Sequence, residues 1–404
     1  MEKKTNGKAN NCISFSTCCY LLITLIIHSC QFPAKDNAID LNANDEVSVF
    51  DIFSEVSVIQ LITQPGELLA NIAVVKYFDS HYYILDDRTQ KIFCFDEQGN
   101  QVFKIDAQGN GPGEYNYINY FSVDTRNEQL VVLDPVVQRV HFFDFSGRHV
   151  LSHTFSFENV LGLSKAYMLT DSLILLTSIT YEHLIYYCLK SEKVVFSDYD
   201  FSSRGVATFT LFLYNYVYKY NNRFFGLLPF SQKLADFTDI PPVEVFYWNF
   251  GKSNNTPKQW DRLLSELENE GEKIFFYHDA VGKDKILNHY IFILAETNLF
   301  RLAIVEFEND YKHVFVNKTE GSAFVFDSFM EGVRLVFSFF QEDRVILVEP
   351  PGFESIREKF PPELAHRSYK IYDLELLSET DRQIIENHNP MTDNPFLVVY
   401  KFRE

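Results

Sequence analysis

The stretch Tyr83–Val102 reads YILDDRTQKIFCFDEQGNQV, and Val131–Val150, one 48-residue step later, reads VVLDPVVQRVHFFDFSGRHV. Without a gap, Leu85, Asp86, Gln90, Phe95, Asp96, Gly99 and Val102 recur as Leu133, Asp134, Gln138, Phe143, Asp144, Gly147 and Val150. Each copy divides into a strand ending in Asp, a short loop, a second strand ending in Phe-Asp, a turn and a third strand. The glycine of the turn supplies the positive φ that a tight hairpin requires. The pattern therefore predicts a repeated unit of short strands.

The length of this repeat is typical of β-propeller blades. A blade is a four-stranded sheet that cannot bury both faces alone and stacks on its neighbours, and its repeat is about 40 to 50 residues long. Tyr117–Val123 supplies the fourth strand of the second unit. Four more degenerate blades are expected at residues 173–196, 209–250, 274–316 and 323–348. We therefore expect an all-β, six-bladed propeller of four-stranded antiparallel blades over residues 47–404.

Three further features complete this architecture. The chain has 40 Phe and 23 Tyr, which favour half-buried strands. The terminal run Pro395–Phe402 is strand-like, and Val47–Leu61 alternates like a strand, so we expect the two to pair in one blade and close the ring. Residues 259–270 place Trp260, Leu263, Leu264 and Leu267 at helical spacing. We expect this short helical insertion to cover one face of the ring.

The N-terminus is typical of a targeting segment. A basic start precedes the apolar run Tyr20–Ile27, which is far shorter than the roughly 20 residues that span a bilayer. The run ends in Ile27–Cys30, which resembles the bacterial lipobox, where the cysteine is lipidated and becomes the new N-terminus. The alternatives are a secretory signal with an incidental cysteine and a buried N-terminal helix. We favour a signal peptide over 1–29, lipidation of Cys30, and a tether over 30–46.

A lipid anchor of this kind would hold the protein on a membrane surface without a spanning helix. Gln31 after Cys30 does not argue for retention at the inner membrane, so we expect the outer membrane of a cell envelope. Within the folded part, the cysteines are Cys94 and Cys188. They would form one disulfide in an oxidising compartment or serve as two small buried hydrophobic residues, and we favour the second interpretation.

The charge of the chain argues against one class of partner. Its formal net charge is −19, and no long basic run is present. Such an acidic surface would repel phosphate, so we expect no nucleic-acid partner.

Two stretches carry a resemblance to a known family. The loop Gly109–Tyr115, after the Phe-Asp-x-x-Gly turn of the first unit, and the ending Asp393–Tyr400 are similar to those of the six-bladed β-propeller lipoproteins of Bacteroidetes. This family is largely uncharacterised and is related to NHL-repeat propellers. The resemblance implies an envelope-anchored propeller and attaches no reaction to it.

One face of the expected ring carries the candidate binding residues. Strands alternate in direction within a blade, so the loops after the second and fourth strands leave from the same face. In the first two blades this face would carry Asp86, Asp87, Arg88, Glu114, Tyr115 and Asp134. The Asp residues would coordinate a cation such as Ca²⁺ at the channel, or they would be turn residues that accept backbone N–H bonds. We favour the turn role because both Asp86 and Asp134 recur with the repeat, and we expect no resident metal or cofactor.

Two classes of function follow from these observations. The sequence contains no recognisable catalytic motif. The glycine-rich stretch Gly109–Gly113 resembles a phosphate-binding loop, but no Lys follows it. The chain also has no Gly-x-Ser-x-Gly and no His-Glu-x-x-His motif. The first class is a scaffold that binds a glycan, a peptide or a partner protein. The second is a propeller enzyme of the lactonase or lyase type, with a metal at the mouth of the central channel. We favour binding, because no catalytic residues can be assigned.

Overall fold

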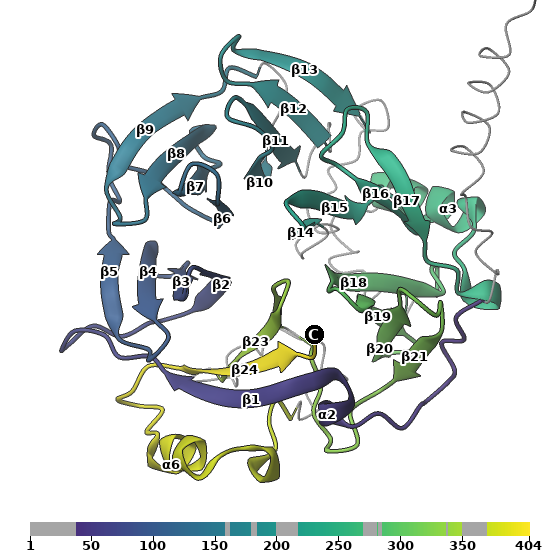
Figure 1. The fold of residues 1–404 in the computed structure, drawn as a ribbon. Helices are drawn as coiled ribbons and strands as arrows, with labels where there is room; N and C mark the ends of the chain where they lie inside the picture. The colour runs from purple at the N-terminus through teal and green to yellow at the C-terminus, as the bar shows by residue number, and fades with distance from the viewer. Residues whose placement is uncertain are drawn as a thin grey trace, which may run out of the picture. The chain divides into compact units, whose positions relative to one another are not determined.

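The protein is described by a computed structural model, which covers residues 38–157, 162–178, 184–198, 217–269, 281, 285–336, 338–349 and 370–404. The chain from Ile39 onward forms one compact unit. Six sheets of four antiparallel strands stand around a ring, with the first strand of each sheet innermost (Figure 1). The expected six-bladed β-propeller is confirmed.

Five blades are built from consecutive strands, and the sixth combines both ends of the chain. Blade one contains β2 (Ile72–Phe78), β3 (His81–Asp86), β4 (Lys91–Asp96) and β5 (Gln101–Ile105); blade two contains β6 (Tyr120–Asp124), β7 (Gln129–Asp134), β8 (Arg139–Asp144) and β9 (His149–Thr154). Blade three contains β10 (Leu163–Met168), β11 (Leu173–Ser178), β12 (Leu184–Cys188) and β13 (Lys193–Asp198); blade four contains β14 (Val217–Tyr220), β15 (Arg223–Leu227), β16 (Lys233–Asp236) and β17 (Val243–Tyr247). Blade five contains β18 (His289–Glu296), β19 (Phe300–Phe307), β20 (Asp310–Asn317) and β21 (Ala323–Phe326); blade six contains β22 (Phe339–Phe340), β23 (Arg344–Glu349), β24 (Phe396–Phe402) and β1 (Phe53–Gln60).

The sixth blade closes the ring. Its outermost strand β1 comes from the start of the fold and pairs antiparallel with β24, so that Phe53 lies opposite Phe402 and Val58 opposite Val398 (Figure 1). This is the expected pairing of Val47–Leu61 with Pro395–Phe402, and it is confirmed. Because β24 also pairs with β23, the terminal strand lies inside a sheet and has no free edge.

The recurring Phe-Asp-x-x-Gly turns explain why the two repeat units look alike. Asp96 ends β4, and its Oδ1 accepts the N–H groups two and four residues on, at 3.0 and 2.8 Å. Asp144 ends β8 and makes the same two bonds at 2.9 and 3.0 Å. Gly99 and Gly147 have φ values of +82° and +80°, which glycine adopts without strain. Each turn therefore needs both its aspartate and its glycine.

The core lies between neighbouring blades. The middle strands are buried along most of their length, as in β3, β4, β7 and β8, whereas the outer strands β9, β13 and β17 are largely exposed. Burial on both faces requires apolar residues at successive positions, and the aromatic-rich strands provide them. Cys94 of β4 and Cys188 of β12 are both free; Cys94 is buried, which raises the pKa of its thiol to about 12, and Cys188 is half-buried.

One boundary differs from expectation. Ala323–Phe326 was expected to open the sixth blade, yet β21 pairs with β20 and is the outer strand of the fifth. The turn at residues 318–322 is therefore a hairpin inside one blade, not a junction between blades. The predicted strand residues 209–216 and 274–280 lie outside the described residues.

Helices occur only at the periphery of the described strands. The expected insertion is confirmed as α3 (Pro257–Asn269), whose Leu263 is buried and whose Trp260 ring lies 6.0 Å from that of Phe230. The other helical elements among the described residues are short, namely α2 (Val49–Ile52), η2 (Gly251–Ser253), η4 (Leu374–Leu376) and α6 (Glu379–Asn387). No helix among the described residues is long and apolar enough to span a membrane.

The segment before β1 packs against the propeller over part of the expected tether. Ile39 and Leu41 are buried in a cluster that contains Trp248 and Phe250. The N–H of Ile39 donates to the carbonyl of Asn249 at 2.8 Å. The folded unit therefore includes residues that we expected to belong to the 30–46 linker. The predicted signal peptide, residues 1–29, and the lipidation site Cys30 lie outside the described residues.

Candidate functional site

Asp86 and Asp134 lie at equivalent places, at the ends of β3 and β7, and both are fully buried. Oδ2 of Asp86 accepts the N–H of Ala70 at 2.7 Å, and its Oδ1 accepts three further N–H groups at 3.1 to 3.2 Å. Oδ2 of Asp134 accepts the N–H of Asn116 at 2.7 Å, and its Oδ1 accepts that of Val136 at 3.0 Å. Each carboxylate therefore ties the segment entering its blade to the turn after the second strand.

The loop at residues 109–115 is stabilised by a hydrogen bond within the loop. Glu114 is exposed, but its Oε2 accepts the N–H of Gly111 at 2.7 Å. A Cβ on Gly109 would lie 2.1 Å from the same oxygen, so a side chain at this position would displace the Glu114 carboxylate. Tyr115 is fully buried and donates to the carbonyl of Gln90 at 2.7 Å, and burial raises the pKa of its hydroxyl to about 12.

Among the six residues of the predicted face, the structure therefore leaves three with exposure to solvent. Arg88 and Glu114 are exposed, and Asp87 is half-buried with its Oδ1 accepting a bond of 2.6 Å from the Asn71 amide. Across the described residues, no three His, Cys, Asp or Glu side chains are grouped as metal ligands.

The structure places three polar side chains in contact that no sequence pattern had indicated. Ser152 Oγ on β9 lies 2.8 Å from His141 Nδ1 and 2.8 Å from His149 Nε2. A serine within hydrogen-bond reach of a histidine is the first half of a nucleophile–base pair. However, Nε2 of His141 has no hydrogen-bond partner among the described residues, so no third group orients the ring. Burial lowers the pKa of His141 to about 4.

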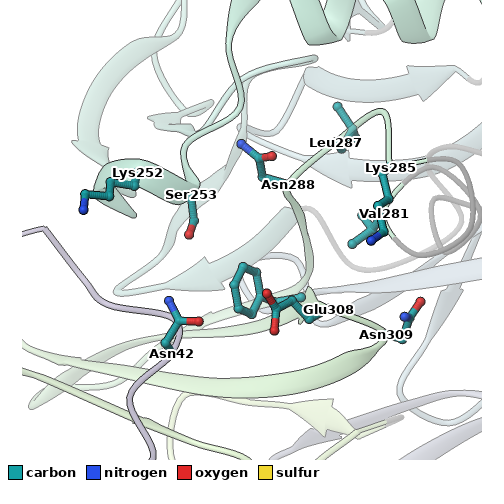
Figure 2. A pocket seen from close by; sticks show the side chains of 10 residues that line it. Asn42, Lys252, Ser253, Val281, Lys285, Leu287, Asn288, Glu308 and Asn309 are labelled. Atoms are coloured by element: carbon teal, nitrogen blue, oxygen red, sulfur yellow. The ribbon is translucent and has the colours of Figure 1, made fainter.

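A pocket lies elsewhere on the face predicted from strand direction. It has a volume of 420 Å³ and lies between blades four and five (Figure 2). Its walls come from Asn42, from the segment after β17, the fourth strand of blade four, and from the turn after β19, the second strand of blade five. Loops after second and fourth strands share one face, so the pocket and the predicted residues of blades one and two lie on the same side of the ring.

The floor and the rim of this pocket differ in character. Val281, Leu287 and Phe307 are buried and apolar. The polar side chains that line the pocket are those of Asn42, Lys252, Ser253, Lys285, Asn288, Glu308 and Asn309, and Figure 2 shows them around an open space. A cavity of a few hundred Å³ with an apolar floor and a few polar groups is the usual form of a small-molecule site.

The residues at the rim of the pocket differ in how firmly the surrounding structure holds their side chains. Glu308 and Asn309 form a two-residue hairpin turn with φ values of 49° and 65°, which point the chain outward from β19 and β20. Asn288 is fixed instead, because its Nδ2 donates to the Asn254 carbonyl at 3.0 Å and its Oδ1 accepts from Gln259 at 3.2 Å. By contrast, the side chains of Lys252, Ser253, Lys285, Glu308 and Asn309 form no hydrogen bond or ion pair with any other described residue.

The comparison with known protein families covers nearly the whole propeller. Residues 36–401 match DUF4934, a domain of unknown function. The chain belongs to the DUF4934 family. No curated protein matches it.

Two solved structures from Bacteroides share the fold of this DUF4934 protein. One is a protein of Bacteroides fragilis described as exported, 15% identical, with a TM-score of 0.68 over 91% of this chain and 100% of that one. The other belongs to the DUF4221 family of Bacteroides vulgatus, 11% identical, with a TM-score of 0.50 over 89% and 99% of the two chains. At these identities the likeness shows the propeller fold.

Proposed function

We propose that this DUF4934 protein is a non-catalytic binding protein of a bacterial cell envelope, exported and held on the outer membrane by a lipid on Cys30. The N-terminal apolar run ending in Ile27–Cys30 supports export and anchoring. The Bacteroides fragilis propeller of the same fold is described as exported, which agrees with this location. We also propose that the protein is a member of the six-bladed propeller lipoproteins of Bacteroidetes, which its sequence resembles.

The ligand site in this proposal is the pocket between blades four and five, and its ligand is a glycan fragment. Five polar side chains of its lining form no hydrogen bond or ion pair with other described residues, which is the observation that carries the proposal. Amide, hydroxyl, carboxylate and ammonium groups can donate to and accept from vicinal sugar hydroxyls. The apolar floor around Phe307 suits the C–H face of a sugar ring. Charges of both signs, Lys252 and Lys285 with Glu308, favour a polar ligand over a strongly ionic one.

The test is a glycan array probed with the purified protein and with three variants. We expect the protein to bind at least one glycan on the array. Lys252→Met should weaken this binding roughly tenfold, the equivalent of one lost hydrogen bond to a charged group, and Ser253→Ala should weaken it less, because it removes a neutral donor. Arg88→Met is the matched control, because it removes an exposed cation from the same face in blade one. The proposal would be overturned if the protein bound no glycan on the array, or if Arg88→Met lost as much glycan binding as the two pocket variants.

Metal analysis of the purified protein separates binding from the lactonase or lyase alternative. A propeller enzyme of that kind would carry a metal at the channel mouth. We expect less than one equivalent of any divalent cation per chain. A stoichiometric cation would count against the non-catalytic proposal and in favour of the enzyme.

A further inference from the structure

The outermost strands of the blades differ in how much apolar surface they expose to solvent. Strands β9 and β13 each expose two aliphatic side chains. Strand β17 of blade four exposes Val243, Val245 and Tyr247, at 50%, 41% and 41%, and Ile240 in the turn before it is 40% exposed. We call these four residues the apolar rim of blade four. Exposed apolar side chains along an edge strand usually mark a surface that another molecule covers.

The charge along this strand is already compensated within the blade. Glu244 is the one charged residue of β17, and its Oε2 lies 2.8 Å from Nζ of Lys233 on the neighbouring strand β16. The chain as a whole has a formal net charge of −19. The apolar rim is therefore a locally neutral strip on an acidic protein, which favours an apolar or zwitterionic surface as its partner over an anionic one.

The N-terminal part of the folded unit begins next to the same strand. The N–H of Ile39 donates to the carbonyl of Asn249, two residues after β17 ends, at 2.8 Å. From there the chain runs along the rim of blade five to α2, and the N–H of Asp45 donates to the carbonyl of Val325 in β21 at 2.8 Å (Figure 1). Cys30, the predicted lipidation site outside the described residues, precedes Ile39 by nine residues, which reach at most about 32 Å when fully extended.

We propose that the apolar rim of blade four contacts the lipid bilayer that holds the Cys30 anchor, an inference that rests on the anchor in the proposed function. A short tether makes this contact intramolecular, so the effective concentration of lipid is high and a weak apolar contact suffices. The aliphatic side chains would enter the boundary between headgroups and acyl chains. Tyr247 suits the same depth, because its ring is apolar and its hydroxyl is polar.

Quenching of an introduced tryptophan by brominated lipid tests the contact. The full chain, processed and lipidated in a bacterial host, is reconstituted into phosphatidylcholine vesicles with brominated or ordinary acyl chains. We expect Val245→Trp to lose most of the fluorescence of the added tryptophan in the brominated vesicles, because the ring would reach the acyl boundary. Val150→Trp is the matched control, since Val150 is 46% exposed on the outer strand β9 of blade two. It should be quenched no more than the wild type.

A second substitution tests whether the contact is apolar. Val243→Asp, added to Val245→Trp, should reduce the quenching to that of Val150→Trp, because a carboxylate is costly to bury at the acyl boundary. Both rim positions are exposed, so the core is unchanged, and thermal unfolding checks that each variant is folded.

The intact mass of the purified chain separates the two ways in which the proposal can fail. A chain without acyl groups would refute the lipid anchor of the proposed function and, with it, the membrane contact. An acylated chain whose Val245→Trp variant is quenched no more than Val150→Trp, or as strongly with Val243→Asp as without it, would refute the membrane contact alone.

Discussion

Buried aspartates fix how blades one and two begin. Asp86 and Asp134 carry no solvent exposure, and their oxygens accept main-chain N–H groups from two separate segments. The recurrence of Asp86 as Asp134, 48 residues later, thus reflects the construction of a blade. A residue repeated for that reason more often serves the blade than a ligand, and none of the pocket residues belongs to the two repeat copies.

The first prediction concerns Asp134. Asp134→Ala removes the acceptor for N–H groups that include those of Asn116 and Val136, so we expect a loss of roughly 2 to 4 kcal/mol in the free energy of unfolding. Urea unfolding measures it. Asp87→Ala is the matched control, because Asp87 is half-buried and, among the described residues, its carboxylate accepts a hydrogen bond only from the Asn71 side chain. Equal stability of the two variants would contradict the role given to Asp134.

The second prediction concerns three buried histidines. Burial is the main cause that lowers the pKa of His141 and His289 to about 4 and that of His313 to about 3. Nε2 of His313 accepts the Leu335 N–H at 2.9 Å, which requires the neutral ring. Unfolded histidines titrate near 6.5, so below that pH the unfolded chain binds more protons than the folded one.

The stability that the neutral histidines provide is therefore complete above about pH 6.5 and is lost progressively as the pH falls toward their folded values. We expect the free energy of unfolding to decrease already between about pH 6.5 and 5, above the range where ordinary carboxylates titrate. Urea unfolding at several pH values measures this slope. A constant free energy over that interval would show that the three rings are not held neutral by the fold.

At the scale of the element, the hairpin turns connect neighbouring blades as well as strands. The N–H of Ile62, just after β1, donates to the Gly99 carbonyl at 2.8 Å, and the N–H of Gln101 donates back to Ile62 at 3.0 Å. The turn of blade one is thus fastened to the outer strand of blade six. A Cβ on Gly99 would lie 2.0 Å from the Gln60 carbonyl oxygen.

The third prediction compares two glycines. Gly66 and Gly99 have φ values of +83° and +82°, but a Cβ on Gly66 meets nothing within 4 Å. Gly66→Ala should cost roughly 1 to 2 kcal/mol for the backbone conformation alone. Gly99→Ala should cost about 1 to 3 kcal/mol more, because the turn must move away from β1. Thermal unfolding separates the two, and equal costs would mean that the contact between turn and strand is not tight.

The elements show what the sequence could and could not predict. Blades one and two were predictable because their Asp and Gly turns keep the same spacing, and ring closure because a terminal strand needs a partner. The boundary at Ala323 was wrong because Gly321, with a φ of +70°, makes a hairpin turn that resembles a junction between blades. The pocket was not predictable, since it joins Asn42 to segments more than 200 residues away along the chain.

The whole ring depends on one pairing between the ends of the fold. Strand β24 pairs with β23 on one side and with β1 on the other, so the blade is complete only when both chain ends are in place. Val398 and Tyr400 are fully buried there. A closing blade of this kind should open only when the ring as a whole opens.

The fourth prediction follows from that closure. Amide hydrogen exchange should be as slow for β24 as for the buried middle strands β3 and β7, because all three require global unfolding to expose their N–H groups. Peptide-resolved exchange with mass spectrometry measures it. Exchange of β24 that is many times faster than that of β7 would show that the sixth blade opens on its own and that the ring is not closed cooperatively.

The central functional claim is that the pocket between blades four and five binds the ligand of this propeller. A crystal structure of the protein in complex with a glycan that it binds on the array tests this claim most directly. We predict electron density for the sugar against Phe307, with polar contacts from Lys252, Ser253 or Glu308. Density for the sugar beside Asp87 and Arg88 in blade one, with the pocket of blades four and five empty, would contradict the claim.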